Sequence, residues 1–359
     1  MRFSIYLNAQ SPSPGHDRDV IKAVTEQAVI ADRAGFSGIC LTDHHFTGYN
    51  TYGNPFTFGA YLYPQLSNST IVLSVAVPAL SNPLNFAEQC NLLDMLTQGN
   101  CVIGIGSGGS PLEYLGLGRD AQRRGALTEE VMAVVDAALD KKLDDPDLQY
   151  RTEHAQGTLR LRIMPTSWNR RPRFARAALT EEGALQAAKR GWPLMTGRML
   201  PDEIGTRYAL YHSALDSAGH DAATLAYARK WSFTQKMVFV ADSDAAAAAA
   251  VEGPLDYLTT MTRNLFSSSP GTPGFKNSVV GVSPEDRAGF VEKSMIIGSP
   301  DTVAKQISEY EAVGLDHMSL VFLYGQMDPA VARRSLRLFI DEVMPRYASA
   351  TTGEPAAQR

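Results

Sequence analysis

Two adjacent histidines beside an acid are the residues of this chain best suited to chemistry. Asp43, His44 and His45 directly follow the apolar run 38–41, which is typical of a buried parallel strand. A parallel α/β barrel presents its catalytic groups at the carboxyl ends of its strands, and histidine exchanges protons near neutral pH. Because neighbouring residues at a strand end point opposite ways, we expect one histidine to be functional and the other to hydrogen-bond the loop to the barrel.

A glycine-rich turn, Gly104-Ile-Gly-Ser-Gly-Gly-Ser-Pro111, follows another apolar run. Glycine lets a backbone approach an anion closely and aim its amides at it, so a phosphate cradle is one interpretation. A tight barrel turn in which glycine serves only a positive φ is the other, and the residues leave both open. The turn lacks the lysine of a P-loop, and we expect no helix to follow it at once.

Three arginines stand where they could bind a phosphate. Arg123 and Arg124 precede a predicted helix, and Arg198 follows a predicted strand. A solvated surface position is the alternative for each of them. The sequence predicts no metal site, because adjacent histidines point apart and the other histidines are scattered. These are His16, His154, His212, His220 and His317.

Repeated βα units must position these residues, because short apolar runs alternate with amphipathic stretches almost from end to end. We predict strands near 3–8, 38–42, 71–77, 101–106, 174–178, 193–196, 233–240 and 318–323. We predict helices at 17–34, 85–97, 124–142, 181–190, 201–218, 242–266, 300–313 and 328–344, the last one ending before Pro345. The pattern indicates a (β/α)8 TIM barrel with insertions.

The predicted barrel is a single domain, 1–348, followed by a flexible tail, 349–359. Insertions at about 143–173 and 267–292 interrupt the alternation. The second is rich in Gly, Pro and Ser and is too long for an ordinary connection, which favours an active-site lid over a disordered excursion.

Composition and charge point to a small-molecule partner. The chain has 359 residues, 44% of them hydrophobic, and a formal charge of −5, which gives no reason to expect nucleic acid or a membrane surface. No apolar run approaches the length of a membrane span, and the first strand is not a signal peptide. The three cysteines lie in apolar elements and are expected to be reduced core thiols of a cytoplasmic protein.

Several motifs in order resemble the bacterial luciferase-like family of flavin-dependent monooxygenases. Asp43-His-His-Phe-Thr47 and Gly53-Asn-Pro-Phe56 resemble the EHHFT and GNPY of the luciferase α-subunit, and Asn91-Leu-Leu-Asp94 resembles its NLLD. The similarity covers about the first 120 residues. It resumes at Gly298-Ser-Pro300 and Asp341-Glu-Val-Met-Pro345.

The resemblance implies a TIM barrel that uses reduced FMN and O2, with the FMN supplied by a separate NAD(P)H-dependent flavin reductase. It implies that His44 is the catalytic histidine beside the flavin, with His45 next to it, and that Glu113 lies near the isoalloxazine. It also implies a homodimer. We place the cofactor contacts at Val75, Gly106, Ser107, Gly108, Arg123, Arg124, Ala178, Leu179 and Arg198.

Departures from the luciferase pattern fall on the flavin contacts. Gly106 and Ser107 stand where luciferase has a reactive cysteine and a phosphate-binding arginine, and Ala178 and Leu179 stand where it has Glu and Ser. The phosphate contacts must therefore be rebuilt here. We expect a flavin monooxygenase that oxidises a small organic substrate. The alternatives are a deazaflavin-dependent oxidoreductase of the same fold and a non-catalytic flavin-binding barrel.

Overall fold

The computed structural model describes residues 1–267 and 284–347. Eight parallel strands close into a barrel, and β11 returns to pair with β1. In barrel order they are β1 (Arg2–Leu7), β2 (Gly38–Leu41), β3 (Thr70–Ala76), β4 (Cys101–Ile105), β7 (Phe174–Ala177), β8 (Leu194–Gly197), β9 (Phe233–Val240) and β11 (His317–Val321). The predicted (β/α)8 fold is confirmed, and each predicted strand overlaps one strand of the barrel.

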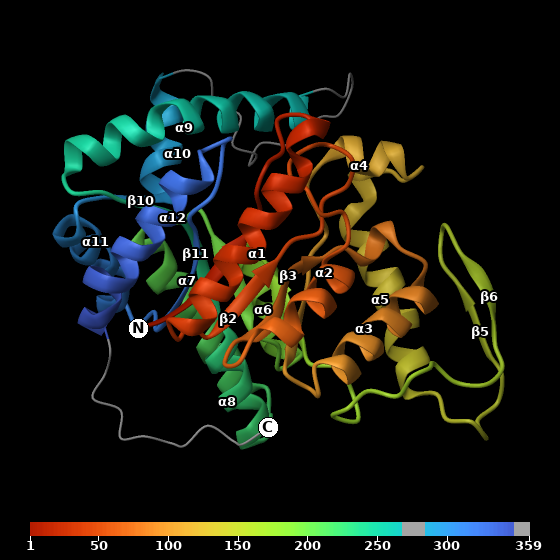
Figure 1. Cartoon of the computed structure of the whole chain (residues 1–359). Coiled ribbons are helices and arrows are strands. Elements are labelled where there is room, and N and C mark those ends of the chain that lie inside the picture. Colours follow the sequence, from red (N-terminus) through yellow and green to blue (C-terminus); the bar gives the residue numbers. More distant parts are fainter. Residues whose placement is uncertain (268–283, 348–359) are drawn as a thin grey trace.

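Helices cover the barrel, most of them on its outer side (Figure 1). They are α1 (Asp17–Arg33), α2 (Pro55–Leu62), α3 (Pro83–Leu96), α4 (Pro111–Gly116), α5 (Arg124–Asp140), α6 (Glu181–Lys189), α7 (Pro201–Ser217), α8 (Ala222–Trp231), α9 (Asp244–Ser267), α10 (Pro284–Ser294), α11 (Pro300–Ala312) and α12 (Pro329–Leu338). Gly35 and Gly314 follow α1 and α11 with φ of 88° and 90°, in the left-handed region that glycine adopts without strain.

Two apolar layers hold the barrel together. Inside the ring, one cluster is built from inward-facing strand residues such as Cys40, Val72 and Val102. Outside it, a larger cluster joins the outward-facing residues of the strands to the helices. The alternation follows from the two-residue period of a strand, and both faces are apolar because helices cover the outside. All three cysteines are buried and free, which agrees with the predicted core thiols.

The structure adds elements that the sequence pattern did not reveal. A ninth strand, β10 (Met295–Gly298), pairs with the end of β9 at Met237–Val240. The helices α2, α4, α8 and α10 were also not predicted. Local signals existed for three of them. The side chains of Asn54 and Asp221 cap α2 and α8, and α4 begins at Pro111, directly after the glycine turn, contrary to the expectation that no helix follows it.

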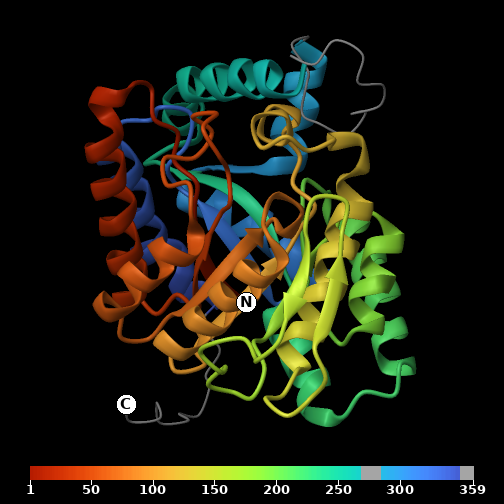
Figure 2. The ribbon, with the colours of Figure 1, turned by 90° about the vertical axis from the view of Figure 1, so that its right-hand side faces the viewer.

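The predicted insertions and the last helix differ in detail from the structure. The 143–173 segment contains an antiparallel hairpin of β5 (Leu148–Arg151) and β6 (Gln156–Leu159), which projects from the side of the barrel (Figures 1 and 2). Most of the predicted lid lies outside the described residues, but 284–292 belong to α10. The predicted tail lies outside them as well. Pro345 sits within a last 3₁₀ turn, Met344–Tyr347, because proline is tolerated near the start of a new turn.

Helix α9 crosses the carboxyl end of the barrel, next to α4 (Figures 1 and 2). Two glycines in loops at this end lie close to residues of α9. A Cβ on Gly48 would lie 3.6 Å from Cε of Met261, and a Cβ on Gly325 would lie 1.9 Å from the carbonyl oxygen of Pro254. Gly325 therefore has no room for a side chain. The loops after β2 and β11 lie beneath this helix, at the end where a barrel carries its site.

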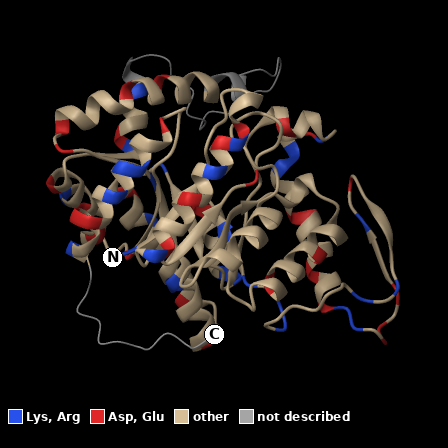
Figure 3. Ribbon diagram, in the orientation of Figure 1, with Lys and Arg blue, Asp and Glu red and all other residues tan. Residues whose placement is uncertain are grey.

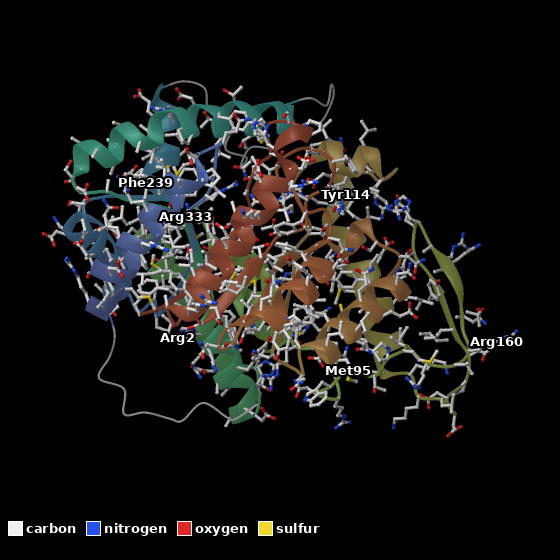
Figure 4. All side chains as sticks on the ribbon, viewed as in Figure 1. Arg2, Met95, Tyr114, Arg160, Phe239 and Arg333 are labelled. Carbon is white, nitrogen blue, oxygen red and sulfur yellow. The ribbon has the colours of Figure 1, made fainter. Side chains whose placement is uncertain are left out.

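Charged residues of both signs are interspersed over the elements, as Figure 3 shows. Figure 4 shows Tyr114 on α4 at the carboxyl end of the barrel and Arg160 beyond the end of β6 at the outer hairpin. Among the described residues, no helix combines the length and the apolar character that crossing a bilayer requires.

Candidate active site

Asp43 fixes the start of the histidine loop to the neighbouring strand. Its Oδ2 accepts the backbone N–H of Val77 at 2.9 Å, and its Oδ1 lies 3.1 Å from Nε2 of His45. The hydrogen bond with Asp43 raises the pKa of His45, while partial burial opposes the rise. This geometry gives His45 the role of a loop anchor between β2 and β3.

His44 turns to a different carboxylate. Its Nδ1 lies 3.0 Å from Oε1 of Glu113, in the first turn of α4. The same oxygen accepts the backbone N–H of His45 at 3.2 Å and the hydroxyl of Thr47 at 3.3 Å. Glu113 is 1% exposed, so three donors from one loop converge on a buried carboxylate. The structure thus brings together the three residues proposed as catalytic.

The hydrogen bond to Glu113 sets the protonation pattern of His44. A carboxylate accepts, so Nδ1 of His44 carries the proton, and Nε2 is left without a partner among the described residues. The ring of Tyr49 packs edge-on against the imidazole, with centroids 4.7 Å apart. Tyr49 was not singled out from the sequence. The result is an oriented imidazole whose second nitrogen can take up or hold a proton.

Glycine serves close packing at one position of the turn after β4 and a positive φ at another. A Cβ on Gly106 would lie 2.5 Å from Cγ2 of Val75, so close packing demands glycine there. Gly108 has φ of 62°, in the left-handed region. The carbonyl of Ser107 accepts the hydroxyl of Tyr114 at 2.6 Å, which holds the turn in place.

Donors in this turn remain available for an anion. The backbone amides of Ser107, Gly108 and Gly109 donate to no described residue. The hydroxyl of Ser110 is buried and has no hydrogen-bond partner among the described residues. Successive unpaired amides at a glycine turn make a concave anion site. The turn therefore fits a phosphate group.

The three candidate arginines have different surroundings. Arg123 forms ion pairs with Glu130, at 3.2 Å, and with Glu153, so its charge is already balanced. Arg124 starts α5 near Tyr114: burial raises the pKa of Tyr114, and the positive charge of Arg124 opposes that rise. Arg124 thus stands beside the residue that holds the glycine turn.

Arg198 follows β8 with φ of 57° and is half-buried. It forms no hydrogen bond and no ion pair with the part of the chain that the structure describes. Burial raises the pKa of Tyr6, and the charge of Arg198 works against that rise. Tyr6 packs against the cluster inside the barrel, so the guanidinium acts on the barrel interior.

The other proposed cofactor positions offer little polar chemistry. Ala178 donates its N–H to the carbonyl of Met195 at 3.0 Å, and Leu179 is 44% exposed while its carbonyl accepts Arg207. Val75 packs on Gly106 and the barrel interior. These side chains can make only apolar contacts with a ligand.

A pocket of about 830 Å³ lies away from the histidine loop, between α7, α10, β10 and α11, and is lined by residues such as Leu200, Glu203 and Tyr310. We place the candidate site by its convergent polar groups instead, since that pocket contains neither histidine.

Among the described residues, no three His, Cys, Asp or Glu side chains are grouped as a metal ion would require.

Polar residues after β1 also join the site and were missed in the sequence. Asn8 accepts the hydroxyl of Thr42 at 2.9 Å, and Gln10 accepts the backbone N–H of Gly325 at 2.7 Å. They tie the carboxyl ends of β1, β2 and β11 together. Their position at the carboxyl end of the predicted strand 3–8 was the signal that could have found them.

Comparison with known proteins shows the family and the fold of the chain. A profile of the family described as Luciferase-like monooxygenase matches residues 1–317. The alkanal monooxygenase alpha chain of Photorhabdus laumondii is 25% identical over 226 residues, 62% of this chain and 61% of that relative. The match thus spans about three fifths of that relative's length. The oxygenase component of the flavin-dependent trigonelline monooxygenase of Acinetobacter baylyi is 22% identical over 97% of this chain and 96% of its own.

Solved structures show the same fold. The monooxygenase RslO1 from Streptomyces bottropensis superposes with a TM-score of 0.79 at 20% identity, covering 97% of this chain and 100% of the other. The oxygenating constituent of 3,6-diketocamphane monooxygenase of Pseudomonas putida, in complex with FMN, gives 0.74 at 20% identity over 96% and 98%. An F420-dependent secondary alcohol dehydrogenase gives 0.70 at 15% identity over 97% and 99%. With the profile match across most of its length, the chain belongs to the luciferase-like monooxygenase family.

Proposed function

We propose that this chain is a flavin-dependent monooxygenase that uses reduced FMN and O2 to oxidise a small organic substrate. The observation that carries the proposal is the pairing of His44 with buried Glu113 at 3.0 Å, beside a glycine turn with unpaired amides. The histidine and the anion site come from β2 and β4, at the same end of the barrel. A phosphate cradle can hold the flavin, and a proton-handling group beside it can assist the oxidation.

The residues present fit FMN in a specific way. The amides of Ser107, Gly108 and Gly109 would hold the phosphate, with Arg124 supplying positive charge nearby. Val75 and the apolar barrel interior would pack against the ring system. The turn replaces side-chain contacts by backbone contacts, which is how the phosphate site can be rebuilt without the luciferase arginine.

The chain's own residues would manage proton transfer and exclude water. Reduced FMN, when bound, supplies the electrons that reduce O2. His44 would hold or deliver a proton at Nε2, while Glu113 keeps the proton on Nδ1 and fixes the ring plane. Asp43 and His45 anchor the loop that carries His44. Helix α9, packed over the loop, would limit the access of water.

The supply of reduced FMN is part of the proposal. We propose a separate NAD(P)H-dependent reductase, supported by the name of the trigonelline enzyme, in which the oxygenase is one component. A homodimer and a cytoplasmic location stay predictions. Sedimentation at micromolar concentration would test the first, and a monomer would count against it.

The alternatives have weaker support. A deazaflavin-dependent oxidoreductase is favoured only by the fold likeness to the F420-dependent alcohol dehydrogenase. A non-catalytic flavin-binding barrel is favoured by the apolar side chains of Ala178 and Leu179.

Oxygen reactivity tests the proposed monooxygenase function. The complex with reduced FMN is prepared without oxygen and mixed with O2, and the release of hydrogen peroxide is timed against free reduced FMN. We expect the wild-type complex to delay release, and His44→Ala to shorten that delay with FMN affinity nearly unchanged. The control is His220→Ala. In the wild type, Nε2 of His220 lies 2.8 Å from the carbonyl oxygen of Ala188. Release by the wild type as fast as from free reduced FMN would rule the proposal out.

A further inference from the structure

Arg198 is a cation at the mouth of the barrel without a partner in the described part of the chain. It directly follows β8, which stands across the ring from β2 and its histidine loop. It is half-buried, and its charge opposes the rise that burial causes in the pKa of Tyr6, a residue that packs against the cluster inside the barrel. A guanidinium presents five donors in a planar fork and retains its charge, so a half-buried one is suited to bind a carboxylate or phosphate.

The backbone around Arg198 is held in an unusual conformation. Its φ of 57° lies in the left-handed region, which a residue with a side chain rarely adopts. The carbonyl of the next residue, Met199, accepts two hydrogen bonds, from Nζ of Lys236 at 2.7 Å and from the hydroxyl of Tyr310 at 3.1 Å. Lys236 is fully buried and also donates to the carbonyl of Lys293. Strained residues held by such networks cluster at ligand sites.

Three carboxylates at the carboxyl end of the barrel have other partners. Asp43 is bound to Val77 and His45, and Glu113 is bound to His44 and its loop. Glu203, in the first turn of α7 after β8, pairs with Lys293 at 2.8 Å. No described carboxylate forms an ion pair with Arg198, so an anion bound there would come from outside the described chain.

The FMN phosphate does not need Arg198. The unpaired amides of the glycine turn and Arg124 provide an anion site after β4, and β7 separates β4 from β8 in the ring. We propose that Arg198 binds a carboxylate on the organic substrate and so selects acidic substrates. The inference rests on the proposed function, because it assumes that the same mouth takes up a substrate beside the flavin.

Acid and amide pairs of the same shape test this inference. Calorimetry measures the binding of benzoate against benzamide, and of octanoate against octanamide, to the protein with and without oxidised FMN. We expect the wild type to bind at least one acid about tenfold or more tightly than its amide. Arg198→Met should abolish the preference, and Arg198→Lys should retain part of it, because a point charge lacks the bidentate fork. Arg334→Met, at an exposed position on α12, is the matched control.

Flavin binding by the same variants distinguishes the sources of the anion. We expect FMN, riboflavin and reduced FMN each to bind Arg198→Met as they bind the wild type. A loss for FMN but not riboflavin would assign Arg198 to the phosphate, and a loss for reduced FMN alone would assign it to the reduced ring; either result overturns the inference. Equal binding of acids and amides by the wild type overturns it as well. An Arg198-dependent acid preference without any flavin binding would refute the proposed function and leave the anion site standing.

Discussion

Replacing Asp43 by asparagine should destabilise the protein in a pH-dependent way. The amide oxygen can still accept the N–H of Val77, and its NH2 can donate to Nε2 of neutral His45. The neutral amide cannot, however, stabilise His45 in its charged form as the carboxylate of Asp43 does. A hydrogen bond to a charged group contributes about 1.5–3 kcal/mol and a neutral one about 0.5–1.5 kcal/mol. The cost is therefore about 2 kcal/mol while His45 is protonated and below about 1 kcal/mol when it is neutral.

The direction of the pH dependence follows from the raised pKa of His45. A group whose pKa is higher in the folded state contributes stability that is complete below its unfolded value, here 6.5, and that is lost as pH rises through the folded value. Unfolding a chain of this length has an entropy of roughly 0.75 kcal/mol per kelvin, so about 2 kcal/mol lowers Tm by about 3 °C. We expect that loss near pH 5.5 and about 1 °C near pH 9.

Thermal unfolding of both proteins across this pH range measures the effect, with Asp32→Asn as control. Asp32 is buried; burial favours a higher pKa, but hydrogen bonds from the backbone N–H groups of Ser67, Asn68 and Ser69 outweigh it and lower the pKa of the carboxyl. Its contribution is complete above its unfolded pKa, so the cost of Asp32→Asn should stay constant from about pH 5.5 to 9. A cost of Asp43→Asn that is equally constant, or larger at high pH, would refute the anchor role of His45.

Three other predictions concern packing, a buried lysine and the thiols. Gly106→Ala should lower the free energy of unfolding by about 1–3 kcal/mol, because the new Cβ would meet Val75. The control Gly125→Ala, with open space around it in α5, should be neutral or stabilising. Equal effects of the two substitutions would contradict the packing. Burial lowers the pKa of Lys236 to about 7, so above that pH the folded state binds fewer protons than the unfolded state. The Tm of the wild type should therefore rise relative to that of Lys236→Met between about pH 7 and 10. A constant difference between the two Tm values would argue against a lowered pKa of Lys236. The buried cysteines should resist a thiol reagent at about pH 8 until denaturant is added, and rapid labelling of the folded protein would contradict their burial.

Sequence patterns sufficed for the barrel but not for its additions. The eight strands were predictable because each is a short buried run flanked by helical periodicity. β10 was not, because Met295 follows α10 directly, without a turn residue between them. Helix α4 was missed although Ser110-Pro111 is a common start, because the glycine turn before it masked the signal.

Side-chain partners in the site depended on contacts that the sequence does not display. The positions of His44 and Glu113 were predictable, but the convergence of three donors on one oxygen was not. Arg123 and Arg198 were both candidates for an anion contact from the sequence. Only the structure separates an arginine balanced by two glutamates from one without a described partner, because ion pairs form between residues distant along the chain.

Anaerobic titration with reduced FMN tests the central claim most directly. The account predicts saturable binding of one equivalent of reduced FMN, weaker binding of FMN but not of riboflavin in Arg124→Met, and no tighter binding of the deazaflavin F420. The matched control is Arg334→Met. Failure of the protein to bind any flavin, or a clear preference for F420 over reduced FMN, would contradict it.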